Sequence, residues 1–209
     1  HISSAEAVEV IEAAKASGQN VTLETCPHYL LFNHNDVRNK GPIAKCAPPL
    51  REEDDQQKLL SCFIDGKFDF ITSDHSPCPY SMKDTENMFE AWGGISGGQF
   101  TLVSCIELAI QHSISFTDIA KWTATKPAKR FNLQSKGKIE VGMDADLAIV
   151  CLQDYTVTEE SFFAKHKHSI YLNHTFPCKV THTFSNGKLI FENDKISSSI
   201  SEGRWVSIK

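Results

Sequence analysis

The sequence predicts an α/β body followed by a small β-rich module, and three observations support this prediction. Helical patterns alternate with short apolar runs in the first two thirds of the chain, as is typical of α/β proteins. Near Gly137 the pattern changes to short β-type runs. The dipeptide Asn186-Gly187 lies between the last two runs and is a strong hairpin signal. We therefore expect two domains, 1–135 and 136–209.

Each helix of the first domain is predicted from apolar residues spaced three or four apart and from residues typical of helix ends. Ser3 or Ser4 can cap the first helix and Gly18 can end it, while Thr117 is a cap candidate for the fourth. The expected helices cover residues 3–17, 52–63, 100–111 and 117–125.

The expected strands are short apolar runs that stop at proline or polar residues. In the first domain, residues 21–26 end at Pro27 and residues 68–72 end at 73–75. In the second domain we expect strands at 147–150, 178–184 and 189–191.

Composition excludes several classes of protein. The 209 residues carry a formal net charge of -5 without a lysine or arginine cluster, which argues against a nucleic-acid partner. No apolar stretch reaches the length of a membrane span, so no membrane partner is expected. The seven cysteines form no CxxC pair, and their odd number favours reduced, buried thiols in a cytoplasmic protein.

Candidate functional residues lie where the predicted strands end, because side chains at the carboxyl ends of parallel strands form the sites of α/β barrels. Asp74 and His75 follow the second strand, and His1 precedes the first helix and could itself lie at a strand end. A carboxylate and an imidazole that converge there suit a divalent metal ion. An aspartate in this position can equally be a cap or turn residue.

Six segments occur in an order that resembles the amidohydrolase superfamily, within its cyclic-amide hydrolase branch of dihydroorotases, hydantoinases and allantoinases. The forms SDHSPCP and AWGGISG are most similar to those of allantoinases. The segments are HISS (1–4), ETCPHYL (24–30), CAPPLR (46–51), SDHSPCP (73–79), AWGGISG (91–97) and GKIEVGMDADL (137–147).

The resemblance implies the C-terminal portion of a (β/α)8 TIM-type barrel, followed by a small β-sandwich segment. It implies two divalent metal ions, zinc first, with cobalt, manganese or nickel as alternatives. His1 would bind one metal, and Asp74 would bind the other and act as general base. The expected reaction is hydrolysis of the ring amide of allantoin to allantoate, a step of purine catabolism.

The resemblance also implies substrate contacts. Ala47 would hold the ring amide through its backbone, and Gly93 and Gly94 would allow close approach to a small polar ligand. His75 and His28 are candidates for orienting the substrate, or packed histidines with no such role. Trp92 could line the pocket or anchor packing. Arg51 and Glu52 could bridge subunits or reach the pocket, but a charge pair at a helix start is the favoured interpretation.

Other metal ligands of the family have no counterpart in this chain. The bridging carboxylated lysine, a His-x-His pair and a further histidine are missing, and His166-Lys167-His168 is expected to be a solvated surface segment. Because the chain begins with His1, we expect a piece of a longer protein that is inactive alone. By resemblance, the full enzyme would be a homo-oligomer, a tetramer, acting on a small molecule.

Two alternatives stay open. A hydantoinase (dihydropyrimidinase) or a dihydroorotase would share the chemistry and act on a different ring. A non-catalytic scaffold of the same fold would need neither His1 nor Asp74.

Overall fold

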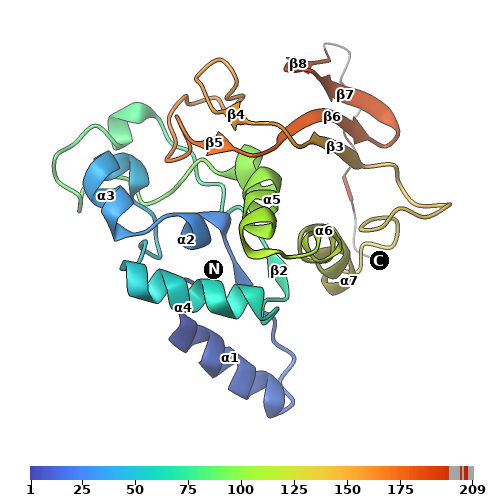
Figure 1. The fold of residues 1–209 in the computed structure, drawn as a ribbon, viewed down its shortest axis with the longest axis horizontal. Helices are drawn as coiled ribbons and strands as arrows, with labels where there is room; N and C mark the ends of the chain where they lie inside the picture. The colour runs from blue at the N-terminus through green and yellow to red at the C-terminus, as the bar shows by residue number, and fades with distance from the viewer. Residues whose placement is uncertain (198–202, 204, 207–209) are drawn as a thin grey trace.

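The computed structural model describes residues 1–197, 203, 205 and 206, so the last part of the expected second domain lies outside the described residues. Helices dominate the first two thirds of the chain (Figure 1). The α-helices are α1 (Ala5–Ala16), α2 (Pro27–Leu31), α3 (His34–Lys40), α4 (Glu53–Ile64), α5 (Thr101–His112), α6 (Phe116–Ala120) and α7 (Lys126–Arg130). The shorter turns are the 3-10 helices Gly41–Ala44, Tyr80–Met82 and Gly98–Phe100 and a π-helical turn, Lys121–Thr125.

Eight strands form three small sheets among the described residues. β1 pairs in parallel with β2, β4 pairs with β5 in an antiparallel sheet, and the remaining four strands form an antiparallel sheet in the order β3-β6-β7-β8. Their bounds are β1 (Glu24–Thr25), β2 (Phe70–Ile71), β3 (Leu147–Cys151), β4 (Tyr155–Thr156), β5 (Thr175–Phe176), β6 (Lys179–Ser185), β7 (Lys188–Glu192) and β8 (Lys195–Ile196).

The predicted strands of the first domain are confirmed in place but are shorter than expected. Leu23 and Asp69 lie beside the β1–β2 ladder without joining it as a regular pair. The Leu23 N–H donates to the Asp69 carboxylate (2.8 Å), and the Asp69 N–H donates to the Leu23 carbonyl (3.0 Å). A side chain thus takes the place of a backbone acceptor, and the regular ladder stops there.

The prediction of one helix over 117–125 is wrong in detail, because the chain forms three consecutive helical segments there. Its cap is Ser115 and not Thr117, since the Ser115 side chain accepts a hydrogen bond from the Thr117 N–H. After α6 the chain passes through the π-helical turn into α7, whose first turn holds Pro127. Proline is tolerated there because the first N–H groups of a helix need no partner within it.

Helices α2 and α3 were not predicted from the sequence. Pro27 ends the strand as expected, but it also occupies the first turn of α2. α3 begins with a capping box, in which the Asn33 side chain accepts from the Asn35 N–H (2.8 Å) and Asp36 accepts from the Asn33 N–H (2.9 Å). Helix α2 packs against α4 and α5, so it lies between two longer helices.

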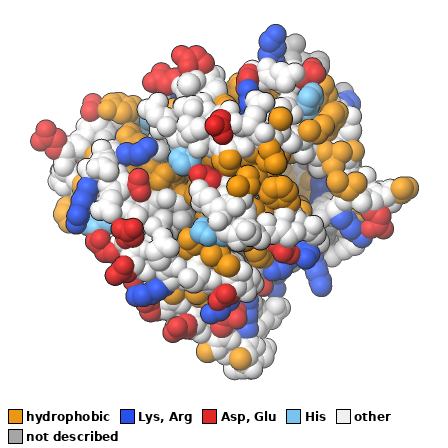
Figure 2. Space-filling view, in the orientation of Figure 1, with side chains coloured by type: hydrophobic (Ala, Val, Ile, Leu, Met, Phe, Trp, Pro, Cys, Tyr) orange, Lys and Arg blue, Asp and Glu red, His pale blue; other side chains and the backbone are white. Residues whose placement is uncertain are grey.

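The four-stranded sheet agrees with the predicted strands and turn. Asn186 and Gly187 both have positive φ, 51° and 79°, as a two-residue hairpin between β6 and β7 requires. Several apolar side chains of the sheet remain exposed, among them Ile149 (48%) and Ile196 (58%). Hydrophobic side chains also gather on the face shown in Figure 2, around the position of α5 below the sheet.

One hydrophobic core joins residues on both sides of the predicted domain boundary at 135/136. The ring of Phe100, at the start of α5, lies 5.2 Å from that of Phe162 and 4.8 Å from that of Tyr171, measured between centroids. Phe176 of β5 stacks on Phe100 at 6.0 Å. Residues 157–178 therefore pack with the α/β body, and the four-stranded sheet touches this core through Val150 and Val180.

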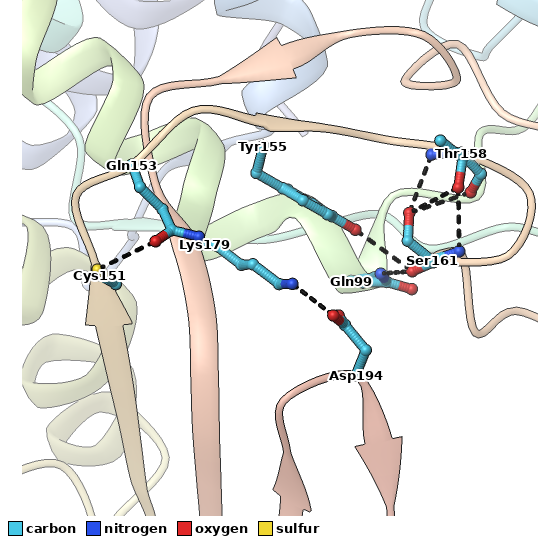
Figure 3. Close-up of polar contacts among 8 residues, drawn as sticks. All are labelled: Gln99, Cys151, Gln153, Tyr155, Thr158, Ser161, Lys179 and Asp194. Atoms are coloured by element: carbon cyan, nitrogen blue, oxygen red, sulfur yellow. Dashed lines mark hydrogen bonds and ion pairs between the residues drawn. The ribbon is translucent and has the colours of Figure 1, made fainter.

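Polar contacts reinforce this junction (Figure 3). Gln99 donates to the Ser161 carbonyl (2.7 Å) and accepts from the Phe163 N–H (2.9 Å). Lys179 of β6 pairs with Asp194 in the β7–β8 turn, at 2.5 Å. These contacts hold the 158–163 loop to the start of α5 and tie the turn to the sheet.

Six of the seven cysteines are buried and unpaired, which agrees with the prediction, while Cys151 is exposed at the end of β3. Among the described residues, no helix has both the length and the apolar character needed to cross a membrane.

Candidate active site

Parallel pairing brings the ends of β1 and β2 to the same edge, next to the first residues of the chain. In the β1–β2 register, Thr25 lies opposite Ile71, and the Thr72 N–H continues the pairing by donating to the Thr25 carbonyl (3.1 Å). On the other side of β1, the Ile2 N–H donates to the Glu24 carbonyl (2.8 Å). His1 and Asp74, far apart in sequence, are therefore neighbours.

His1 lies between two carboxylates. Its Nε2 is 3.2 Å from Oδ1 of Asp74, and its Nδ1 is 2.7 Å from Oε1 of Glu24. A carboxylate on one ring nitrogen fixes the ring orientation and leaves the other nitrogen for a metal ion, as in many metal-binding histidines. The residues present fit a divalent metal ion, which His1 and Asp74 would hold while Glu24 orients the His1 ring.

Asp74 has an unusual backbone conformation, with a φ of 43° in the left-handed region. Non-glycine residues adopt this region at a cost, and aspartate is among those that tolerate it best. This residue lies three positions after the end of β2, and its carboxylate lies beside His1. Its side chain keeps about a quarter of its surface exposed (26%).

A second group of donors lies beside the first. The ligand atoms of Cys26, His28 and Asp74 all lie within 4.8 Å of one another. Cys26 and His28 are fully buried, and among residues 1–197, 203, 205 and 206 neither ring nitrogen of His28 finds a hydrogen-bond partner. Burial lowers the pKa of His28 to about 3 and raises the pKa of the Cys26 thiol to about 12, so neither group is charged at neutral pH.

The residues predicted to contact the substrate amide lie together in two adjoining loops. A Cβ placed on Gly93 would lie 3.5 Å from Cβ of Ala47, so these two residues are in contact range. A Cβ on Gly94 would lie only 2.5 Å from Oγ of Ser76, two residues after Asp74. Trp92, 41% exposed, donates from Nε1 to the same Ser76 hydroxyl (3.3 Å).

His75 is placed differently from the other predicted residues. Its Nδ1 accepts a hydrogen bond from the Gly98 N–H (3.1 Å), and no hydrogen bond joins it to His1 or Asp74. Its side chain lines a cavity of about 540 Å³ that is bounded mainly by apolar residues of the small sheet and the 162–164 segment. His75 thus separates from the metal-ligand candidates, although it follows Asp74 directly.

One smaller expectation is wrong, and another, the solvated segment at 166–168, is borne out only in part. Arg51 does not pair with Glu52, because its guanidinium donates to the hydroxyl of Ser3 (3.0 Å), while Glu52 pairs with His34. His168 is not fully solvated, since its Nε2 lies 3.8 Å from the sulfur of Cys78 and its ring packs on Tyr80.

Glu24 and Cys26 were not predicted as site residues. The same strand-end rule that selected Asp74 applies to them, because they close the first strand as Asp74 closes the second. Residues two apart on a strand point to the same face, so both could have been placed at the edge that holds His1.

Comparisons with known proteins show what the chain is similar to. Residues 1–190 match the model of the "Amidohydrolase family". The chain is 53% identical to an allantoinase of Bacillus velezensis over 92% of its length, and 39% identical to an allantoinase of Rubrobacter xylanophilus over 99%. It covers 42% and 46% of these relatives, so it spans less than half of their length.

Solved structures give the same picture of the fold. The L-hydantoinase (dihydropyrimidinase) of Arthrobacter aurescens superposes with a TM-score of 0.89 at 29% identity, over 94% of this chain and 45% of that one. A D-hydantoinase of Thermus sp. superposes with a TM-score of 0.90 at 20% identity, covering 99% of this chain and 47% of that one. The fold is thus an α/β domain of the TIM-barrel type found in these hydrolases.

Proposed function

The chain belongs to the amidohydrolase family, and from this premise we propose that the protein containing it opens the ring of allantoin by hydrolysing a cyclic amide bond, giving allantoate. The observation that carries the proposal is the contact between His1 and Asp74, Nε2 to Oδ1 at 3.2 Å, at the carboxyl edge of two parallel strands. The high identity to an allantoinase supports the choice of substrate.

His1 and Asp74 would each hold a divalent metal ion, zinc first, with cobalt, manganese or nickel as alternatives. When bound, such ions lower the pKa of a water molecule and polarise a carbonyl oxygen. Glu24 keeps Nε2 of His1 directed toward Asp74 through its contact with Nδ1. The carboxylated lysine and the other histidines of the site would come from the rest of the protein.

Asp74 has the position and the exposure for a general base. Its carboxylate would take the proton released when water adds to the amide carbon and return it to the departing ring nitrogen. A general base is identified first by its position relative to the reacting atoms, and only then by its pKa. Ala47, Gly93 and Gly94 would bring backbone groups close to the ring. His28 and His75 were the other predicted substrate contacts. One ring nitrogen of His28 lies near Asp74, but the side chain has no exposed surface through which it could reach a substrate.

For the whole protein, we extend the proposal to a complete (β/α)8 barrel, of which residues 1–135 are the C-terminal part, and a β-sandwich to which 136–209 contribute. The partly exposed apolar side chains of β3, β7 and β8 support this, because a sandwich needs a second sheet to cover them. We further propose a cytoplasmic homotetramer that acts on a small molecule.

The test is the substitution Asp74→Asn in the full-length protein, followed by the rate of allantoate release. Because the amide cannot accept the proton and binds metal poorly, we expect the rate to fall by about a thousand-fold, within the usual range for a lost general base. The matched control is Asp84→Asn, an exposed aspartate in the loop after the same strand, which should keep its rate. An Asp74→Asn variant with normal activity would contradict the proposal.

A hydantoinase is the second candidate, because L-hydantoinase shares the fold at 29% identity. Rates with allantoin, a 5-substituted hydantoin, dihydropyrimidine and dihydroorotate distinguish the candidates. If no substrate reacts and metal analysis of the full-length protein finds no divalent ion, the non-catalytic scaffold is the correct interpretation.

A further inference from the structure

The buried histidine beside the candidate catalytic residues is the observation that needs an explanation. His28 has no exposed surface, and neither Nδ1 nor Nε2 has a hydrogen-bond partner within the part of the chain that the structure describes. Buried polar atoms are nearly always paired, because leaving them unpaired costs about 1–3 kcal/mol. One ring nitrogen of His28 lies close to the Cys26 thiol and the Asp74 carboxylate, so we expect a ligand to bind between these three groups.

We propose that Cys26, His28 and Asp74 form a binding site for one thiophilic divalent cation, Zn²⁺ or Cd²⁺, and that an ion bound there inhibits hydrolysis by occupying Asp74. The three residues contribute one sulfur, one imidazole nitrogen and one carboxylate oxygen. The binding site stands independently of the proposed function, while the inhibition rests on it.

The geometry needs only a small contraction to hold an ion. The donor atoms lie within 4.8 Å of one another, whereas ligands of a tetrahedral zinc ion are roughly 3.5 Å apart. Cys26 immediately precedes α2, and among the described residues its sulfur makes one long polar contact, 3.9 Å to the Thr72 hydroxyl. It can therefore move toward an ion without losing a strong hydrogen bond.

The donor set determines which ions would bind. Thiolate and imidazole ligands select zinc-like ions over Mg²⁺ and Ca²⁺, which prefer oxygen. On binding, the Cys26 thiol would release its proton to solvent and form a metal–sulfur bond. The thiolate and the Asp74 carboxylate would then balance the two positive charges of the ion.

Sharing Asp74 makes the site inhibitory. The same carboxylate lies 3.2 Å from His1, where the proposed reaction needs it as a base. An ion held by Cys26 and His28 would bind an Asp74 oxygen and draw the carboxylate away from His1. Inhibition should therefore appear as excess metal is added beyond the ions that support catalysis.

The experiment titrates Cd²⁺ into the full-length protein with its resident metals in place and records the ultraviolet thiolate-to-cadmium absorption. The exposed thiol is first removed by Cys151→Ser, which defines the parent protein. We expect the band in the parent and in Cys105→Ser, a control at a fully buried cysteine outside the cluster. Cys26→Ser should lose the thiolate-to-cadmium absorption band. His28→Gln should keep the band but weaken Cd²⁺ binding by about tenfold or more.

A band of equal strength in Cys26→Ser and Cys105→Ser, or no band in the parent, would overturn the site. Unfolding curves check that the variants are folded, and His28→Gln tests the site separately if Cys26→Ser is not. The second readout is allantoin hydrolysis with added Cd²⁺, where the parent and Cys105→Ser should be inhibited and Cys26→Ser should not. Cd²⁺ binding without inhibition would overturn the shared role of Asp74. A full-length protein that does not hydrolyse allantoin would defeat the proposed function, while the absorption band still decides the site.

Discussion

At the scale of single residues, two adjacent glycines differ in what they allow. A methyl group on Gly94 would lie 2.5 Å from the Ser76 hydroxyl, whereas one on Gly93 would be in ordinary contact, 3.5 Å, with Ala47. Gly94→Ala should therefore displace Ser76 and with it the neighbouring Asp74. We expect allantoin hydrolysis by the full-length protein to fall by about tenfold or more, because small displacements of catalytic groups are costly.

The comparison for this substitution is Gly93→Ala, whose added methyl group would be in ordinary contact with Ala47. Gly93 also lies among the proposed substrate contacts, so Gly93→Ala should lower the rate, but by less than Gly94→Ala does. Kinetic constants for the two variants, together with their unfolding curves, separate a local displacement from a loss of folding. Equal rates in Gly94→Ala and the unchanged protein would show that the loop is not coupled to the site.

A buried lysine predicts a pH dependence of stability. Lys83 donates to the carbonyls of Pro42 (2.9 Å) and Lys45 (2.8 Å), and burial lowers its pKa to about 8, against the opposing effect of the nearby thiols of Cys78 and Cys46. The unfolded chain keeps the lysine proton up to about pH 10.5. Between these values the unfolded state binds more protons, so stability due to this group rises with pH.

We subtract the unfolding free energy of Lys83→Met from that of the unchanged protein. Because the unchanged protein gains stability as Lys83 loses its proton, this difference should rise by up to about 1.4 kcal/mol per pH unit between about pH 8 and 10. Comparison with Lys83→Met removes the effect of the cysteines, which titrate in the same range. Urea unfolding at several pH values measures the difference. Lys67→Met, at an exposed lysine, should show no such growth.

Candidate site residues could be predicted from the sequence where they lie at the end of a strand. Asp74 and His1 follow from the strand-end rule and from the resemblance, and the structure brings them into contact. The direction of His75 could not be predicted, because adjacent residues after a strand turn to different sides and only the Gly98 contact shows which. The burial of His28 and Lys83 depends on helices and loops distant in sequence, so no local pattern revealed it.

At the scale of secondary structure, α3 depends on its capping box. Asn33 caps the helix through the Asn35 N–H and also donates to the Gln56 side chain in α4 (3.1 Å). Asn33→Ala should lower the free energy of unfolding by about 1 kcal/mol or somewhat more, since it removes both contacts. Asn39→Ala, at an exposed site in the same helix, should leave stability unchanged or slightly raised. Chemical unfolding distinguishes the two.

Long elements were predicted better than short ones. α1, α4 and α5 span twelve residues each, enough for the spacing of apolar residues to be visible. α2 and α3 span five and seven, less than two full turns, so no periodicity could appear. The sign that was present, Asn33 followed three residues later by Asp36, is a variant of the usual capping box and was not used.

At the scale of the whole molecule, Phe100 is the residue on which the two parts of the chain meet. Its ring is 1% exposed and contacts aromatic rings at 162, 171 and 176, all beyond the predicted domain boundary. Phe100→Ala should lower the free energy of unfolding by about 3–5 kcal/mol, the usual cost of emptying a buried aromatic site. Phe89→Ala, at a ring that is 96% exposed, should change it by less than about 0.5 kcal/mol.

The measurement is urea unfolding monitored by two spectroscopic probes, one in residues 1–135 and one in the part of the chain after residue 135. Because the core is shared, both probes should report the same midpoint in the unchanged protein, and both midpoints should move together in Phe100→Ala. A shift confined to one probe would mean that the two parts unfold independently.

The aromatic contact of Phe100 with Phe176 also has a consequence for synthesis on the ribosome. The two residues are 76 positions apart, so at about 5–20 residues per second the pocket around Phe100 stays open for roughly 4 to 15 seconds before its last ring emerges. During that interval the growing chain exposes apolar surface that the finished protein hides. Chaperone contact with the nascent chain should therefore end when residue 176 has left the exit tunnel, and not at the predicted domain boundary.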